Sequence, residues 1–226
     1  MPHQSFLNRL LDELRPVLTS RSEKAVQNMR NVLLGIEEER TPQSLSPRNS
    51  YFADIFWSYN EIHQAHDRLK LAQELLSGSS RPDVIAYHVE KHLEEVYILK
   101  GRMVAFARKL KRLLLRKNDP KLAAMIKQVE ETIESSFEGI VKTRGSHVHE
   151  YRYADFELKR LVTIDLLVEN GEMKELADLK REAIDANLER WGRTMKANIE
   201  AVEILLDKLC EMVTPIVFEI LPPPKS

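Results

Sequence analysis

The sequence predicts an all-α protein, an up-and-down helical bundle with a long C-terminal helix. Only 7 of the 226 residues are glycine and 7% are aromatic, which is typical of long helices rather than of β-sandwiches or barrels. Apolar residues recur every three or four positions along most of the chain, the period of an amphipathic helix. A chain of this length can bury a sizeable core.

The first 40 residues form the N-terminal helical segment. Apolar residues lie at helical spacing from Phe6 to Leu18 and again from Val26 to Ile36, with a polar interruption at 19–22. This pattern predicts two short helices or one broken helix. The stretch 41–50 (TPQSLSPRNS) combines two prolines with hydroxyl and amide side chains. These residues disfavour helix, and we expect a loop there.

Residues 51–170 form the predicted bundle core. The apolar pattern indicates helices over about 51–76, 84–115, 122–143 and from 156 to about 170. Helix-breaking residues separate them where a glycine or a proline interrupts the pattern, at Gly78, Pro120 and Gly171.

The last segment, 172–226, holds the long C-terminal helix, which packs on the core or on a partner. A helix over about 172–213 would be roughly 60 Å long, and Pro215 and the tail LPPPKS follow it. Its apolar residues alternate at spacings of four and three, as in a coiled-coil seam that also contains Asn198: Ile184, Leu188, Trp191, Met195, Val202, Leu205 and Leu209. The seam either packs within the chain or pairs two chains in a homodimer.

Charge is balanced overall and basic locally. Lys plus Arg is 34, Asp plus Glu is 35 and the net charge is −1, which gives no global attraction to polyanions. The positions from Lys100 to Lys121 nevertheless contain a single acid, Asp119. Within this stretch a basic stripe of Arg108, Arg112 and Arg116 repeats every four residues on one helix face. The stripe either binds phosphates or is a solvated face balanced by acids such as Glu90, Glu94 and Glu95.

Two histidine pairs have helical spacing that suits a metal ion, His63 with His66 and His88 with His92. Ordinary surface or capping roles compete with this interpretation. Cysteine ligands and an HExxH motif are both absent, so we expect neither a metal nor another cofactor.

The chain is expected to be cytoplasmic and to stay out of the membrane. Its single cysteine, Cys210, excludes an internal disulfide, and the start MPHQSFLNRL lacks the apolar core of a signal peptide. No apolar run approaches the roughly 18–20 residues of a membrane span.

The segment with the clearest functional pattern is RGSHVH, from Arg144 to His149, between two predicted helices. It places Arg144, Ser146, His147 and His149 within six positions. A helix start presents backbone N–H groups to an anion, arginine forms a bidentate fork on phosphate, and histidine titrates near neutral pH. This combination suits phosphodiester chemistry.

At these residues the chain resembles the HEPN superfamily, helical bundles in which an arginine is followed four to six residues later by a histidine at a helix junction. The resemblance extends loosely over about 50–170, and Gly145 stands where the family usually has a polar residue. It implies a metal-independent endoribonuclease, often a toxin or defence component, whose active site forms between two protomers of a homodimer.

In such a site the resemblance assigns proton transfer to His149 and stabilisation of the phosphorane to Arg144. His147 would carry the second proton, Ser146 would hold the scissile phosphate, and Arg108, Arg112 and Arg116 would track the RNA backbone.

Two alternatives stay open. In one, Arg144 pairs with Glu150 or Asp155 and the histidines cap the following helix. In the other, the chain is a non-catalytic HEPN-like protein that binds nucleotide, RNA or a protein partner such as an antitoxin.

Overall fold

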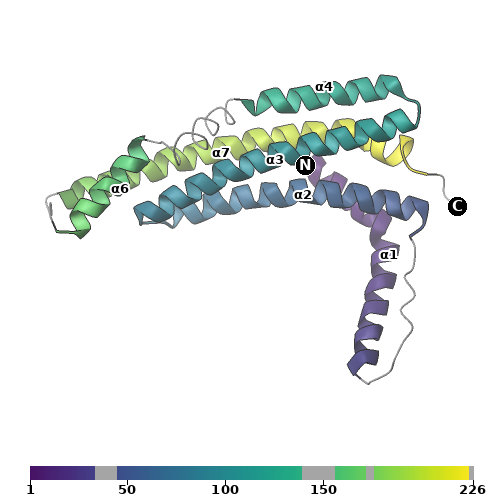
Figure 1. Ribbon diagram of the computed structural model, residues 1–226, viewed down its shortest axis with the longest axis horizontal. Coiled ribbons are helices and arrows are strands. Elements are labelled where there is room, and N and C mark those ends of the chain that lie inside the picture. Colours follow the sequence, from purple (N-terminus) through teal and green to yellow (C-terminus); the bar gives the residue numbers. More distant parts are fainter. Residues whose placement is uncertain (34–44, 139–155, 172–175, 224–226) are drawn as a thin grey trace.

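The computed structural model describes residues 1–33, 45–138, 156–171 and 176–223, and within these ranges it is an all-α bundle without strands (Figure 1). The predicted fold class is therefore confirmed, including the long C-terminal helix, which has 39 residues. The helices are α1 (Pro2–Leu33), α2 (Pro47–Ser77), α3 (Pro82–Arg116), α4 (Pro120–Ser136), α6 (Phe156–Glu169) and α7 (Ala177–Pro215), followed by the π-helical turn η2 (Ile216–Ile220). No helix in these ranges has the length and apolar surface needed to span a bilayer.

Local chemistry sets the helix ends. Helices α2, α3 and α4 each begin at a proline, whose fixed φ and missing N–H suit the first helical position. Asp119 caps α4 by accepting a hydrogen bond from the Leu122 N–H at 3.0 Å. After α6, Gly171 adopts a φ of 72°, a conformation that favours glycine and stops a helix.

Two predicted boundaries need correction. Helix α1 runs unbroken through 19–22, because these polar side chains are exposed to solvent and leave the backbone hydrogen bonds of the helix intact. Helix α2 begins at Pro47 rather than after residue 50, since the Oγ of Ser46 accepts a hydrogen bond from the Asn49 N–H at 3.2 Å and so starts the helix earlier.

The helices α2, α3 and α7 run lengthwise together, and α4 lies along α3 (Figure 1). One apolar cluster joins α1, α2, α3, α4, α7 and η2, with residues such as Phe6, Phe52 and Phe106 at its centre. A second cluster joins the end of α2, the start of α3, α6 and α7. The first half of α1 belongs to this body, whereas its second half projects away from it (Figure 1).

The seam of α7 is used within the chain. Its residues Trp191, Met195 and Leu209 are buried against the other helices. Asn198 lies with its Nδ2 3.2 Å from the Nε2 of the buried His92 on α3. In this arrangement the seam packs within the chain, and Asn198 connects α7 to α3.

Candidate functional site

The motif residues Arg144, Ser146, His147 and His149 lie outside the described residues. The described chain reaches them from both sides: α4 is capped by the buried Phe137, and α6 starts at Phe156. Among the described residues, the basic stripe of α3 forms the candidate site.

Arg108, the first residue of the stripe, forms ion pairs between α3 and α4. Its Nε lies 2.5 Å from the Glu130 Oε1 and its Nη2 lies 3.2 Å from the Glu134 Oε1. Lys111 bonds the other oxygen of Glu130 at 2.8 Å. The hydrogen bonds from Lys111 and Arg108 lower the pKa of Glu130, so this carboxylate stays ionised. The acids that balance these charges come from α4, across the helix packing, rather than from Glu90, Glu94 and Glu95 on α3 itself.

Arg112 and Arg116 differ from Arg108. Both are exposed, and neither makes an ion pair or hydrogen bond within the described residues. Arg112 lines a groove between α2 and α3, one turn along α3 from Arg108. The stripe therefore divides into one arginine engaged in helix packing and two whose guanidinium groups are available to an anion.

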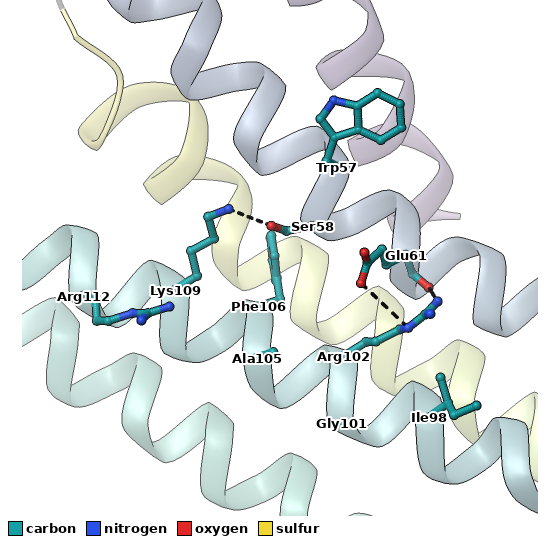
Figure 2. Close-up of a pocket in the computed structure, with 10 residues that line it drawn as sticks. All are labelled: Trp57, Ser58, Glu61, Ile98, Gly101, Arg102, Ala105, Phe106, Lys109 and Arg112. Carbon is teal, nitrogen blue, oxygen red and sulfur yellow. Dashed lines mark hydrogen bonds and ion pairs between the residues drawn. The ribbon is translucent and has the colours of Figure 1, made fainter.

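The groove has a volume of about 410 Å³. Figure 2 shows the residues that line it. Gly101 and Ala105 of α3 leave space along it, and a Cβ added at Gly101 would contact nothing within 4 Å. Ile98 and Phe106 add apolar surface from α3. The other lining residues are cations from α3 and polar or aromatic groups from α2, namely Arg102, Lys109 and Arg112 with Trp57, Ser58 and Glu61.

Two of these cations are held by α2. The Lys109 Nζ lies 2.5 Å from the Asp54 Oδ1 and 2.7 Å from the Ser58 Oγ. Arg102 donates to the backbone carbonyl of Glu61 at 2.6 Å. Figure 2 shows the contacts of Lys109 with Ser58 and of Arg102 with Glu61, which cross from α3 to α2. They fix the edges of the groove, and Arg112 is the lining cation that no described acid neutralises.

Trp57 is a residue of this site that the charge and motif patterns of the sequence do not single out. Its side chain is 64% exposed, and it stands on α2 beside the groove (Figure 2). The signal was present in the periodicity, because Ile55, Tyr59 and Ile62 form the buried face of α2 and Trp57 lies off it. An exposed indole beside cations can stack on a base or a sugar.

The structure separates one of the two histidine pairs and brings the other together. His88 and His92 do not share a site, because His92 is fully buried and contacts Asn198. His63 and His66 lie together on α2 with Asp67 beside them.

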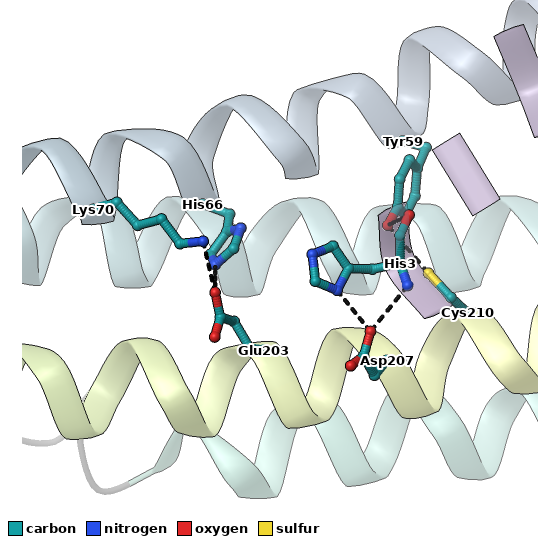
Figure 3. Close-up of polar contacts among 7 residues, drawn as sticks. All are labelled: His3, Tyr59, His66, Lys70, Glu203, Asp207 and Cys210. Atoms are coloured by element: carbon teal, nitrogen blue, oxygen red, sulfur yellow. Dashed lines mark hydrogen bonds and ion pairs between the residues drawn. The ribbon is translucent and has the colours of Figure 1, made fainter. Parts of the chain in front are cut away.

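A second polar cluster lies inside the bundle and anchors the start of α1 (Figure 3). The His3 Nδ1 lies 2.6 Å from the Asp207 Oδ1 on α7, and the Tyr59 hydroxyl bonds the His3 carbonyl at 3.2 Å. The Sγ of Cys210 is 3.1 Å from the same hydroxyl. Burial raises the pKa of the Cys210 thiol to about 12, so the thiol is protonated and has no nucleophilic character at neutral pH. This cluster is structural.

Comparison with known proteins gives no further assignment, since the chain matches no protein family, no curated protein and no solved structure.

Proposed function

We propose that this protein is an RNA-binding, HEPN-like endoribonuclease that holds a single strand along the groove between α2 and α3 and cleaves it through Arg144 and His149. The observation that carries the RNA-binding part is that one groove is lined both by Arg112, which has no described acidic partner, and by the exposed Trp57. Cleavage rests on the RGSHVH motif and its resemblance to HEPN domains.

The groove suits a single strand better than a duplex. Proteins bind single strands by combining a cationic groove that follows the backbone with aromatic side chains on which bases stack. Arg112 and Arg116 supply free guanidinium groups for phosphates, and Trp57 supplies the stacking surface. Arg108 is excluded from this role, because binding a phosphate would break its ion pairs with Glu130 and Glu134.

The proposed chemistry needs no metal. His149 would accept the proton of the ribose 2′-hydroxyl as it attacks the adjacent phosphorus, and His147 would protonate the leaving 5′-oxygen. Arg144 would stabilise the charge of the phosphorane, and Ser146 would hold a phosphate oxygen by a hydrogen bond.

A homodimer belongs to the same proposal, because HEPN sites form between two protomers. The seam of α7 is buried within the chain, so such a dimer would use another surface. An antitoxin or other protein partner would bind this homodimer. Light scattering of the full chain at micromolar concentration tests the dimer, and a monomer contradicts a composite site.

Binding can be tested by the fluorescence of Trp57 alone. The chain has two tryptophans, and the Trp191→Phe variant removes the other one, whose side chain is only 6% exposed. We expect single-stranded RNA to quench Trp57. We also expect Arg112→Ala to weaken binding and to lower the salt slope by about 0.7 for each lost phosphate contact.

Arg193→Ala is the matched control, since it removes another exposed arginine whose partner is on α7 itself. Equal effects of the Arg112 and Arg193 substitutions, or no quenching, contradict the groove.

Cleavage is tested separately with end-labelled RNA in EDTA. We expect cleavage by the wild-type chain and by His88→Ala, and its loss in His149→Ala. RNA that binds with Trp57 quenching but stays intact supports the non-catalytic alternative. If the protein neither binds nor cleaves RNA, the whole proposal is overturned.

A further inference from the structure

We infer that α2 carries a divalent transition-metal site of the Zn²⁺ class, formed by His63, His66 and Asp67. The three residues occupy positions i, i+3 and i+4 of the helix, so they lie on one face within a single turn. This inference is independent of the proposed function, and none of the three residues lines the groove.

The distances fit one ion. Each residue offers a ligand atom within 4.8 Å of those of the other two, and the His63 Nδ1 lies 3.2 Å from the Asp67 Oδ2. Two ligands of a tetrahedral Zn²⁺ are about 3.3 Å apart when each bond is about 2.0–2.1 Å long. The His63–Asp67 separation is already close to this value, and His63 and Asp67 are the less buried members, which can move toward the buried His66 as an ion binds.

His66 is the buried member of the three, and its ring is placed against α7. The residue is only 2% exposed, and its Nε2 is buried with no hydrogen-bond partner within the described residues. The nearest carboxylate oxygen, the Glu203 Oε1 on α7, lies 3.4 Å from that nitrogen. Leaving a buried polar atom unsatisfied costs about 1–3 kcal/mol, so this ring is not in its best arrangement.

A metal ion on Nδ1 would leave the proton on Nε2, the nitrogen that faces Glu203. A metal-bound histidine commonly donates its other ring N–H to a carboxylate, which fixes the tautomer and the orientation of the ring. Figure 3 shows Nε2 directed at Glu203, which leaves Nδ1 for the metal. Glu203 also bonds the Lys70 Nζ at 2.6 Å, so the ammonium charge near the site is balanced.

The ligand chemistry selects the metal class. Two imidazoles and one carboxylate suit Zn²⁺ and its neighbours in the first transition row, whereas Mg²⁺ and Ca²⁺ prefer oxygen ligands alone. Three protein ligands leave a further position for water, and the exposed side of Asp67 gives access to it.

Calorimetric titration of the full chain with ZnCl₂ tests the site. We expect one Zn²⁺ per chain, binding at least tenfold weaker in both His63→Ala and Asp67→Ala, and unchanged binding in His88→Ala. His88 is a matched control because it is a partly exposed histidine on a neighbouring helix. Circular dichroism shows whether each variant keeps its helix content. We expect Asp67→Ala to keep it, because the Asp67 side chain is exposed.

Glu203→Gln tests the outer contact, with an expected loss of about 10- to 100-fold in affinity at unchanged stoichiometry. Co²⁺ replacing Zn²⁺ should give the visible absorption of a histidine-ligated ion in the wild type and lose it in His63→Ala. The inference is overturned if Zn²⁺ does not bind, if binding survives either ligand substitution, or if His88→Ala abolishes it equally.

Discussion

Acidification should destabilise the protein through His92, the fully buried imidazole that joins α3 to α7. Its Nε2 lies 3.2 Å from the Asn198 Nδ2, which donates to it when the ring is neutral. Burial lowers the pKa of His92 to about 4, because the charged ring would lose its hydration. The folded state therefore favours the neutral ring.

The sign follows from proton uptake on unfolding. In the unfolded chain the pKa of histidine is about 6.5. Between pH 6.5 and 4 the imidazole of residue 92 is therefore mostly protonated in the unfolded state and mostly neutral in the folded state. The contribution of His92 to stability is fully present above about pH 6.5 and is lost as the pH falls toward 4. Linkage gives a loss of about 2 kcal/mol at pH 5 and about 3 kcal/mol at pH 4.

Urea unfolding of the wild type and of His92→Gln, followed by circular dichroism across this pH range, isolates the effect. Glutamine does not titrate, and its Oε1 can still accept from Asn198. Other titrating groups, including the buried His66, affect both proteins alike. The wild type should lose about 2 kcal/mol more than the variant between pH 7.5 and 5. Parallel pH profiles of the two proteins would refute the reasoning.

Three further substitutions test the packing and the helix ends by the same unfolding assay. Phe106→Ala should cost about 3–5 kcal/mol, because this ring is almost fully buried in the main cluster; a cost below about 1 kcal/mol would contradict that placement. Asp119→Ala should cost about 1 kcal/mol by removing the cap of α4, and Asp119→Asn should restore most of it. Glu130→Gln should cost about 1 kcal/mol, since it removes the charge shared by Arg108 and Lys111. High salt should shrink that last difference, and a salt-independent cost would point to lost packing instead.

Much of the helical organisation could be predicted from the sequence, because each helix carries its own signals. The apolar period identified α3 to within two residues at its start and one at its end. Gly171 marked the end of α6 because its backbone conformation favours glycine. The break expected within α1 was wrong, since exposed polar residues at 19–22 are compatible with a helix that needs no buried face there.

The candidate sites were predictable only in part. The spacing of Arg108, Arg112 and Arg116 revealed a basic face but not which arginine is free. Glu130 lies on a different helix, and only the packing of α4 on α3 brings it to Arg108. The spacing of His63 and His66 was likewise visible, whereas Glu203 approaches His66 from α7. The RGSHVH segment lies outside the described residues, so its role stays a prediction.

The sequence by itself determined the fold class, most helix ends and the amphipathic faces of α2 and α3. These properties depend on residues within a turn or two of one another, where backbone hydrogen bonding and side-chain period act directly. Tertiary structure decided the direction in which the seam of α7 packs, the neutralisation of Arg108 and the presence of Trp57 and Arg112 on the lining of one groove. Those outcomes depend on the summed burial of side chains from distant segments, and no local pattern records which charge will meet a partner when the helices pack.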